Sequence, residues 1–441
     1  MEKINTNVFK GDHMLIAIAQ EIAQKGGRSF YTGGYARDYL INGHFDVSGD
    51  IDIEVFRLDS ALLSALLSKY GEVKTVGKIY PILKIKGYPQ LDFTAAGQDS
   101  YSGAAARRDF TIDAIMIDII SGEIMDHAGG RKDISAKIIR HISPRVFADD
   151  PLRAYRAARL AAKLGFTIHP ETLQLMSAAD LSTLPPERIY AELKKLLFSP
   201  KPSIGLKYLE KTGLLKQLHP ILYSLIGCNQ EPVNHPEGDV WEHTLLVVNA
   251  AAELKHQSQN PAALMWAALL HDIGKPATTR LREGRITAYG HDTEGAKLAA
   301  SFLLDLRCSN TLIENVTVLI REHMHPILLY KQKEQVTDKA IRKLSSQVDI
   351  SELLLLSEAD FNGRGVKRDY SLIRRWLLDR LKELGLKPGK KIEPLIRGRD
   401  LLDLGMIPGD NFKRILDFAF ELQLEGRDKA EIIQAVKAEY Q

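Results

Sequence analysis

Features of secreted and membrane-spanning proteins are scarce in this sequence. Only two of its 441 residues are cysteines, Cys228 and Cys308, and they form neither a CxxC pair nor a disulfide framework, so we expect two reduced thiols. No apolar run approaches the roughly 20 residues that a membrane span needs. The N-terminal stretch carries Glu2, Asp12 and Glu21 in place of the apolar core of a signal peptide. Together these absences predict a cytoplasmic protein that has no membrane partner.

An excess of charge of one sign is also missing. The chain has 59 lysines and arginines against 56 aspartates and glutamates, a net charge of +3, which excludes a uniformly basic coat for nucleic acid. Any contact with a polyanion must therefore come from local patches, such as residues 153–163 and 387–391. With 45% hydrophobic and 26% charged residues, the composition is ordinary for a globular protein. The length is enough for about three domains of roughly 100 to 200 residues each.

Apolar patterning divides the chain into two parts. Up to about residue 140, short strand-like runs alternate with short helical patterns, which predicts an α+β head with a mixed β-sheet. Beyond it, helical periodicity continues almost to the end of the chain, so we expect an all-α remainder. Prolines and glycines that interrupt this periodicity mark candidate boundaries. The predicted domains are a head (1–140), a helical neck (141–228), a third domain (229–365) and a helical tail (366–441).

The end of the segment 29–54 carries a pattern that suits metal binding. Asp50 and Asp52 are two residues apart on a strand-like stretch, so both carboxylates face the same side. Carboxylates placed in this way can share Mg²⁺, and two metal ions on a triphosphate can stabilise the attacking and leaving oxygens of a nucleotidyl transfer. Upstream, Gly33 and Gly34 join an apolar strand to a short helix, where backbone amides can approach triphosphate oxygens. Each feature alone occurs more often as plain structure, but their order and proximity favour a catalytic platform.

Four more segments follow this one and extend the pattern. They are 106–118 (ARRDFTIDAIMID), 126–134 (DHAGGRKDI), 149–166 (DDPLRAYRAARLAAKLGF) and 187–193 (ERIYAEL). Together the five segments resemble the motifs of the class II tRNA nucleotidyltransferases, the superfamily of CCA-adding enzymes and bacterial poly(A) polymerases. Two residues differ from the usual pattern: Asp113 stands where the family has asparagine, and His127 where it has proline. The resemblance implies Mg²⁺-dependent addition of C and A nucleotides, from CTP and ATP, to tRNA 3′ ends.

The resemblance also implies roles for individual residues. Asp50 and Asp52 would bind Mg²⁺, activate the 3′-hydroxyl of the primer and hold the triphosphate. Asp92 would be either a third carboxylate of this site or an ordinary residue at a strand end. The nucleotide pocket would be shaped by Gly33, Gly34, Arg37 and Asp38, with the triphosphate and sugar braced by Arg108 and Asp109. The helix that reads the base would be oriented by Glu187, Arg188 and Glu192.

Two residues of the segment 149–166 can be assigned a role from their chemistry. Asp150 and Arg153 are three apart, so we expect them to share one face of a helix. Cytosine and adenine present an amine beside an unprotonated ring nitrogen, which suits a carboxylate acceptor beside a guanidinium donor, whereas guanine and uracil do not. This predicts a protein template that selects C and A, with Arg156 and Arg159 continuing a basic stripe toward triphosphate or RNA. The alternative is a solvated amphipathic helix with Asp149 as its N-terminal cap.

The helical part holds a second group of potential ligands. Imidazole and carboxylate groups that together suit a transition-type divalent metal come from His243, His271, Asp272 and Asp360. Such a metal can activate water for phosphoester hydrolysis when it keeps an open position. The order of these ligands and the stretch HDIGK resemble the HD phosphohydrolase superfamily, which implies a second divalent metal of unknown identity and the trimming or repair of RNA ends. Three further histidines would either widen this site or be ordinary capping, surface or core residues: His291, His323 and His325.

One departure from the family bears on the product. The family carries a long, arginine-containing loop before its second motif, and members that lack part of it add only CC. Here only the stretch TAAGQDSYSGAA, residues 94–105, intervenes. The sequence therefore leaves a CC-adding enzyme open. Less favoured alternatives are a poly(A) polymerase and a protein in which only the HD site or RNA binding is retained. The tail segment 393–426 also resembles the family and is either a tRNA contact or an amphipathic helical pair.

Overall fold

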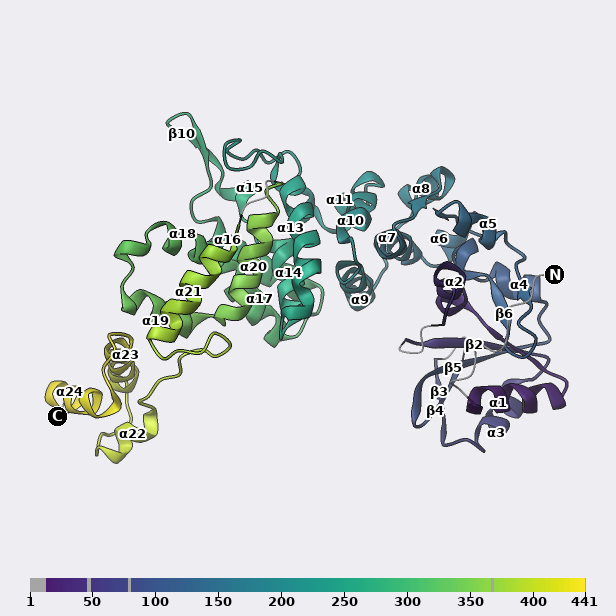
Figure 1. Cartoon of the computed structure of the whole chain (residues 1–441), viewed down its shortest axis with the longest axis horizontal. Coiled ribbons are helices and arrows are strands. Elements are labelled where there is room, and N and C mark those ends of the chain that lie inside the picture. The colour runs from purple at the N-terminus through teal and green to yellow at the C-terminus, as the bar shows by residue number, and fades with distance from the viewer. Residues whose placement is uncertain (1–12, 46–48, 78–80, 366–368, 441) are drawn as a thin grey trace. The chain divides into compact units, whose positions relative to one another are not determined.

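Two compact units make up the computed structural model of the chain, which describes residues 13–45, 49–77, 81–365 and 369–440 (Figure 1). One unit comprises residues 1–184 and 211–214, and the other comprises 185–210 and 215–441. Glu2, Asp12 and part of the first motif, residues 46–48, lie outside the described residues. Cys228 and Cys308 are both free thiols. Within the described part of the chain, no helix combines the length and the apolar character needed to cross a membrane.

The first unit is built on a seven-stranded mixed sheet with the order β3-β4-β5-β2-β1-β6-β7. Its strands are β1 (Arg28–Tyr31), β2 (Ile51–Phe56), β3 (Val73–Val76), β4 (Ile82–Ile85), β5 (Tyr88–Gly97), β6 (Met116–Asp118) and β7 (Ile124–Met125). Within this sheet, as far as the structure describes it, β2 and β5 run parallel and the other neighbours are antiparallel. The mixed sheet confirms the predicted α+β head, and it places β2 in the centre with a partner on each side.

Helices cover and extend this sheet. They are α1 (His13–Gln24), α2 (Gly33–Asn42), α3 (Ser60–Leu67), α4 (Tyr101–Ala106), α5 (Gly130–Ser135), α6 (Val146–Asp149), α7 (Arg153–Leu164) and α8 (Pro170–Ser177), with a 3₁₀ turn η2 (Thr111–Asp113). A short parallel pair, β8 (Ile138–Ile139) and β9 (Thr167–Ile168), ties α7 to the segment that follows α5.

Alternation along β2 explains how the sheet holds its central strand. Ile51 and Ile53 are 3% and 1% exposed, and they belong to one apolar core with Ile18 of α1 and Leu63 of α3. Because side chains alternate across a strand, Asp52 between the two isoleucines points to the opposite face. The apolar side of the sheet therefore fixes the register that presents this carboxylate.

The second unit is almost entirely helical, as predicted. Its helices are α9 (Pro186–Leu197), α10 (Pro202–Lys211), α11 (Leu214–Leu218), α12 (Pro220–Tyr223), α13 (Val240–Leu254), α14 (Pro261–Leu270), α15 (Lys275–Thr278), α16 (His291–Asp305), α17 (Asn310–Glu322), α18 (His325–Lys331), α19 (Asp338–Gln347), α20 (Ile350–Asn362), α21 (Ser371–Glu383), α22 (Gly398–Asp403), α23 (Asn411–Leu424) and α24 (Lys429–Tyr440), with 3₁₀ turns η3 (Lys255–Gln257) and η4 (Lys333–Gln335). Two of these, α10 and α11, lie at the point where the chain passes between the units.

One feature of this unit contradicts the expectation of helices throughout. Strands β10 (Arg280–Arg282) and β11 (Arg285–Thr287) form an antiparallel hairpin. The two residues that join them, Glu283 and Gly284, have φ angles of 49° and 75°, which is the left-handed pair that a tight two-residue hairpin turn requires. Strands of three residues are too short to show alternation in the sequence, so the pattern gave no sign of them.

A buried helix organises the second unit. Every residue of α14 from Ala263 to Leu270 is buried, as expected for a helix that is apolar on all sides. It contacts α13, α17 and α20, while α16 packs along α17. Glycines allow close approach at two of the joints: a Cβ on Gly274 would lie 2.2 Å from the carbonyl oxygen of His291, and one on Gly363 would lie 2.4 Å from a methyl of Val247. The turn after α14 is thereby held against the start of α16, and the end of α20 against the middle of α13.

Candidate functional site

Carboxylates of the first unit gather where β2 and β5 run side by side. Asp50 is exposed just before β2, Asp52 lies inside it, and Asp92 of β5 is the register partner of Asp52. Asp92 therefore lies within a strand rather than at a strand end. Burial raises the pKa of the Asp52 carboxyl, and Asp92, Asp50 and Asp113 add to this against the opposing charge of Arg108. Acidic oxygen donors that repel one another fit a hard divalent cation.

These carboxylates do not enclose a metal by themselves. Among the described residues, groups of three potential ligand atoms within 4.8 Å of one another occur only in the second unit. Asp92 also forms an ion pair with Lys84. The donors of the first unit thus suit a metal such as Mg²⁺, which is commonly held by one or two carboxylates together with the phosphates of a substrate.

The glycine turn of the first motif lies directly against Asp52. Gly33 has a φ of +62°, and a Cβ on it would lie 2.9 Å from Asp52 Oδ2. The backbone N–H of Thr32 donates to the carbonyl oxygen of Asp52 at 2.9 Å. Since α2 begins at Gly33, its free N-terminal amides open beside this carboxylate. The strand, glycine turn and helix predicted from the sequence are confirmed.

A buried ion-pair chain supports the same turn. Arg37 is 3% exposed and pairs with Asp38 at 2.7 Å and with Asp113. Lys163 of α7 pairs with Asp38 at 2.8 Å. The aspartate that replaces the family's asparagine is therefore matched by a buried guanidinium, which accounts for its tolerance at this position.

The second motif is joined to α7 through Asp109. Arg153 and Arg156 approach its two carboxylate oxygens at 2.5 and 2.8 Å. Burial raises the pKa of Asp109, and the charges of Arg156 and Arg153 oppose that rise. Arg108 pairs with Glu54 of β2 at 2.6 Å. These predicted nucleotide-binding groups are held in place by partners within the unit.

The expected geometry of the template pair is wrong in one respect. Helix α7 begins at Arg153, and Asp150 precedes it in an extended conformation (φ −150°, ψ 101°), so the two do not share a helix face. The cause is Pro151, because a proline disfavours the helical region for the residue before it. Asp149 ends α6 rather than capping α7. Arg159 lies on α7 and is partly exposed. Base reading by the pair stays a prediction.

The motif that would orient the template lies on α9. Glu187 is in its first turn, and Glu192 is buried with Lys195 at 3.8 Å. Arg188 lies between them on the same helix. This helix belongs to the second unit, whereas α7 belongs to the first. The role of α9 in orienting the template helix therefore also stays a prediction.

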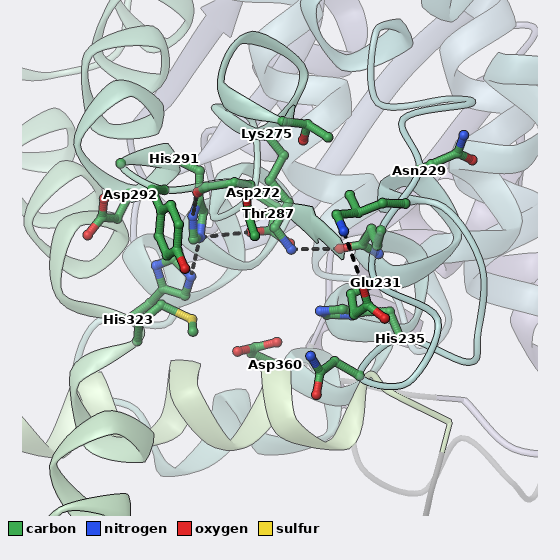
Figure 2. A pocket seen from close by; sticks show the side chains of 18 of the residues that line it. Asn229, Glu231, His235, Asp272, Lys275, Thr287, His291, Asp292, His323 and Asp360 are labelled. Atoms are coloured by element: carbon green, nitrogen blue, oxygen red, sulfur yellow. Dashed lines mark hydrogen bonds and ion pairs between the residues drawn. The ribbon is translucent and has the colours of Figure 1, made fainter. Parts of the chain in front are cut away.

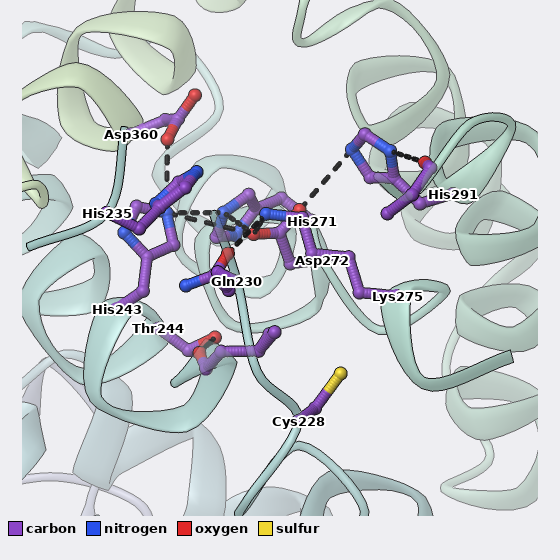
Figure 3. A network of polar contacts seen from close by, with 12 residues as sticks. Cys228, Gln230, His235, His243, Thr244, His271, Asp272, Lys275, His291 and Asp360 are labelled. Carbon is purple, nitrogen blue, oxygen red and sulfur yellow. Dashed lines mark hydrogen bonds and ion pairs between the residues drawn. The ribbon is translucent and has the colours of Figure 1, made fainter. Parts of the chain in front are cut away.

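In the second unit the four predicted HD ligands converge. His243 comes from α13, His271 and Asp272 follow α14, and Asp360 comes from α20 (Figure 3). His243 Nε2 lies 3.1 Å from Asp360 Oδ1 and 3.7 Å from Asp272 Oδ2, and His271 Nε2 lies 3.2 Å from Asp272 Oδ2. None of the four is more than 2% exposed. The sequence spacing alone could not place them, because three packed helices carry them.

Two further histidines join this group. His291, at the start of α16, has its Nε2 3.4 Å from Asp272 Oδ1 and 3.4 Å from His323 Nε2. Potential ligand groups are formed by His243, His271 and Asp272 and by Asp272, His291 and His323, so Asp272 is common to both. His325 instead faces Glu322 at 3.0 Å, a hydrogen bond that raises its pKa. Of the three additional histidines, two thus meet the predicted ligands.

Backbone carbonyls set the orientation of the imidazoles. The Nδ1 atoms of His271, His291 and His323 lie 3.0, 2.8 and 2.6 Å from the carbonyl oxygens of the residues three positions earlier. An N–H at Nδ1 leaves Nε2 as a lone pair directed inward, the arrangement typical of metal-binding histidines. The Nε2 atoms of His243 and His271 face each other at 3.3 Å. Buried acceptors that point at one another are stabilised by a proton or a metal ion between them, so the residues present fit metal binding.

Glu237 is a partner of this site that the sequence reading missed. Its Oε1 lies 2.7 Å from Nδ1 of His243 and 2.9 Å from Nδ1 of His235. Although burial opposes ionisation, these hydrogen bonds lower the pKa of Glu237 to about 2. Likewise, hydrogen bonds to Asp360 and Glu237 outweigh burial and raise the pKa of His243. The stretch HPEGDVWEH, with a His and a Glu just before α13, was the available signal.

Two cations border the carboxylates. Lys275 Nζ approaches Asp272 Oδ2 at 2.7 Å, and Arg364 approaches Asp360 Oδ2 at 3.4 Å. The pKa of Asp272 is well below its usual value because His271 and Lys275 outweigh the effect of burial. Lys275 belongs to the HDIGK stretch and places a positive charge beside the predicted ligands.

A cavity of about 390 Å³ opens onto this cluster. Figure 2 shows Asp272, His291, His323 and Asp360 around it. Other polar groups in its wall include Asn229, Lys275, Thr287 and Arg364. The cavity makes the inward-facing lone pairs accessible to a small ligand.

Family models match three segments of the chain. The chain matches family models for a poly A polymerase head domain over residues 86–140, a probable RNA and SrmB-binding site of polymerase A over 165–225, and an HD domain over 240–360. The fold and sites thus define a protein with a nucleotidyltransferase-type head and an HD domain.

Relatives narrow this class to a family. A protein named multifunctional CCA protein from Xanthomonas campestris pv. campestris (strain B100) is 32% identical over 366 residues, which are 76% of this chain and 85% of the relative. The chain belongs to this multifunctional CCA protein family, as the predicted resemblance indicated. A protein of the same name from Actinobacillus pleuropneumoniae serotype 5b (strain L20) is 38% identical over 273 residues. That match covers 58% of this chain and 64% of the relative, just under two thirds of its length.

Solved structures share the fold. The Bacillus stearothermophilus CCA-adding enzyme in complex with CTP is 22% identical, with a TM-score of 0.66 over 97% of this chain and 98% of that one. The Thermotoga maritima CCA-adding enzyme complexed with tRNA is 19% identical, with a TM-score of 0.61 over 100% and 99% of the two chains. The predicted combination of an α+β head and a helical remainder is confirmed.

Proposed function

We propose that the first unit adds C and A nucleotides from CTP and ATP to the 3′ ends of tRNA, with Mg²⁺ as cofactor. The observation that carries this proposal is the contact between the glycine turn and Asp52, which joins a carboxylate platform to the free amides of a helix N-terminus. The names of the relatives and the CTP and tRNA complexes of the structural neighbours support it.

The residues divide the work of nucleotidyl transfer. The terminal 3′-oxygen of the primer bonds to the α-phosphorus of the incoming nucleotide, the bond to the bridging oxygen breaks, and pyrophosphate leaves. Asp50 and Asp52 would hold Mg²⁺, which when bound supplies charge stabilisation for the attacking and leaving oxygens. Gly33 leaves room for the triphosphate, and the amides at the start of α2 bind its oxygens. Arg108 adds positive charge beside them.

Base selection would fall to Asp150 and Arg153. Arg153 donates from three of its nitrogens: to Asp109, to the carbonyl oxygen of Val146 and to that of Arg107. A guanidinium has five N–H donors, so two remain for the ring nitrogen of a base. Arg156 and Arg159 extend the positive charge along α7. Asp150 supplies the acceptor for the exocyclic amine.

The length of the product is the point at which an alternative stays open. Strand β5 ends at Gly97 and α4 begins at Tyr101, so only three residues separate them. Tyr101 packs against Phe30 and Phe56 with ring centroids 5.3 and 4.7 Å away, which ties this segment to the sheet. A short, anchored connection in place of a long loop favours addition of CC alone as the second candidate.

The test is extension of tRNA transcripts that end before CCA, with Mg²⁺ and CTP, ATP or both, resolved at single-nucleotide length. Extension by three nucleotides with both substrates supports CCA addition, and a stop after two with CTP supports the CC-adding alternative. No extension, with an active reference enzyme in the same assay, contradicts the proposal for the head.

We further propose that the HD site hydrolyses phosphoesters. The observation that carries this is the convergence of imidazole lone pairs and carboxylates at a cavity. His243, His271, Asp272 and Asp360 would hold a divalent metal, and His291 and His323 would extend the set toward a second one that shares Asp272. A metal bound here supplies an activated water. Lys275 and Arg364 would bind the non-bridging phosphate oxygens, and the alcohol leaves as water adds to phosphorus.

Hydrolysis of bis-p-nitrophenyl phosphate and of 2′,3′-cyclic AMP by metal-replete protein tests this second activity. Turnover that requires added metal and is lost in Asp272→Asn supports it. Absence of turnover with every divalent metal tried contradicts it. The domain boundaries at 140/141, 228/229 and 365/366 and the cytoplasmic location remain our predictions, and limited proteolysis tests the boundaries.

A further inference from the structure

A basic hairpin stands beside the HD cavity. Strands β10 and β11 extend from the helical body of the second unit (Figure 1). Arg280, Arg282 and Arg285 are all exposed, and Glu283 in the turn is the acidic residue among them. The backbone N–H of Ile286 donates to Glu231 Oε2 at 3.0 Å, which anchors β11 to the segment before α13. The hairpin is thus a fixed element with a surplus of positive charge.

Within the described parts of the chain, no carboxylate neutralises the arginines of the hairpin. Arg282 and Arg285 are register partners on opposite strands, and like charges placed directly opposite destabilise a strand pair. Among the described residues, neither forms an ion pair with a carboxylate. Arg280 donates to the backbone carbonyl of Thr279 at 2.7 Å. An anion that binds across Arg282 and Arg285 would relieve their repulsion.

The hairpin leads into the cavity through an exposed aromatic side chain. Tyr289 is 71% exposed, and the guanidinium carbon of Arg282 lies 5.1 Å from its ring centroid. Tyr289 lines the cavity together with Thr287 and Ala288, two residues before the candidate ligand His291. Cations that suit phosphates and a ring that suits a base are therefore continuous with the candidate metal site.

We propose that this hairpin and Tyr289 bind the single-stranded 3′ end of an RNA and deliver its terminal phosphate to the HD site. The inference rests on the proposed hydrolysis at that site and assigns the surface that holds the RNA end. Arg282 and Arg285 bind successive backbone phosphates. Tyr289 stacks on a base near the terminus, a contact that tolerates any base sequence. Lys275 and Arg364 then receive the last phosphate.

The test compares two substrates that carry the same reacting group: a short single-stranded RNA ending in a 2′,3′-cyclic phosphate, and 2′,3′-cyclic AMP. For Arg282→Ala with Arg285→Ala, we expect the ratio of kcat/KM values, RNA over mononucleotide, to fall about tenfold or more. The salt dependence of RNA binding should weaken by about 0.7 per lost phosphate contact on the logarithmic scale. Tyr289→Ala should lower the ratio about tenfold.

Two controls separate charge from structure. Arg282→Lys with Arg285→Lys keeps the charge and should restore most of the ratio, whereas Arg375→Ala removes an exposed arginine of α21 and should not change it. If the hairpin serves only the fold, the double alanine variant should lower kcat/KM equally for both substrates. If the hairpin has no role, neither kcat/KM nor the ratio should change. Either result overturns the proposal.

A second readout works even if hydrolysis is absent. A 5′-labelled single-stranded RNA with 4-thiouridine near its 3′ end is photo-crosslinked to the full-length protein, and the attached peptides are mapped. Crosslinks to 280–289 that disappear in the double alanine variant support RNA binding by the hairpin. They do so even if the wild type hydrolyses neither substrate, because absent hydrolysis contradicts only the proposed function. Crosslinks confined to other segments overturn the RNA-end assignment.

Discussion

The two candidate sites bind cations in opposite ways. In the first unit the donors are carboxylates, no three of which lie within 4.8 Å of one another among the described residues. They are partly matched by protein cations, as Lys84 matches Asp92. In the second unit, imidazoles and carboxylates meet within 4.8 Å of one another, and the four predicted ligands are buried. An open, oxygen-only set suits Mg²⁺ that arrives with a triphosphate. A closed, mixed nitrogen and oxygen set suits a resident transition metal.

The difference also shows how each site is supported. In the first unit, a β-strand and a glycine turn fix the carboxylates, so local backbone geometry decides the site. In the second, helices α13, α14, α16, α17 and α20 each contribute or position a ligand, so packing decides it. We expect the first site to be sensitive to changes at single backbone positions and the second to changes in supporting hydrogen bonds.

The largest effect should come from removing one carboxylate of either site. Asp52→Asn takes away a charge that binds the metal on the triphosphate, which is worth several kcal/mol, or about a thousandfold in rate. Nucleotide addition should fall by at least that factor while hydrolysis of 2′,3′-cyclic AMP is kept. Asp272→Asn should do the reverse. Parallel loss of both activities in either variant, with native circular dichroism, would show that the two sites are not independent.

The second largest difference between the sites should appear when bound metal is removed and replaced. After treatment with a chelator and dialysis, Mg²⁺ should restore nucleotide addition fully, because its donor set is oxygen only. Hydrolysis should stay below about a tenth of its original rate with Mg²⁺ and return with Mn²⁺, Co²⁺ or Ni²⁺, which imidazole prefers. Equal recovery of hydrolysis with Mg²⁺ would remove the contrast between the two ligand sets.

Much of this contrast is readable in the sequence, for physical reasons. Predicted ligands that depend on local periodicity, such as Asp52 in β2 and Asp50 just before it, follow from alternation alone. Asp272 follows from its adjacency to His271. The inclusion of His291 and His323 and the exclusion of His325 depend on how α16 and α17 pack, which no spacing expresses.

Local errors had equally physical causes. Helix α7 begins only at Arg153 because of Pro151. The prediction relied on the helical spacing of Asp150 and Arg153 and gave too little weight to the effect of a proline on the residue before it. The hairpin 280–287 was not predicted because its strands are only three residues long. The sequence signal for its turn was a single dipeptide, Glu283–Gly284. Glu237 was not predicted as part of the site because its role depends on a hydrogen bond to His243 across a bend in the chain.

A backbone change should break the first site more than its size suggests. Gly33→Ala places a Cβ about 2.9 Å from Asp52 Oδ2 in a left-handed conformation that costs roughly 1–2 kcal/mol for other residues. A displaced carboxylate can lower catalysis about a hundredfold, so kcat for nucleotide addition should fall by about that factor. Gly43→Ala is the matched control: its φ is +76° but a Cβ there has open space. It should cost similar stability and leave kcat within about twofold. Equal kcat values for the two variants would disprove the steric argument.

The smallest effect should come from a supporting residue of the second site. Glu237→Gln keeps the shape of the side chain but replaces the charged acceptor of the His243 N–H by a neutral one. Loss of such a partner typically weakens metal binding by about 10–100-fold. We therefore expect the metal affinity, measured by competition with a chelating dye, to fall by about tenfold. At saturating metal, kcat for hydrolysis should recover, because Glu237 orients a ligand and does not contact substrate. Nucleotide addition should not change. If kcat stays depressed at saturating metal, Glu237 acts on the reaction itself, and the second site depends on its hydrogen-bonded surroundings for chemistry as well as for holding the ion.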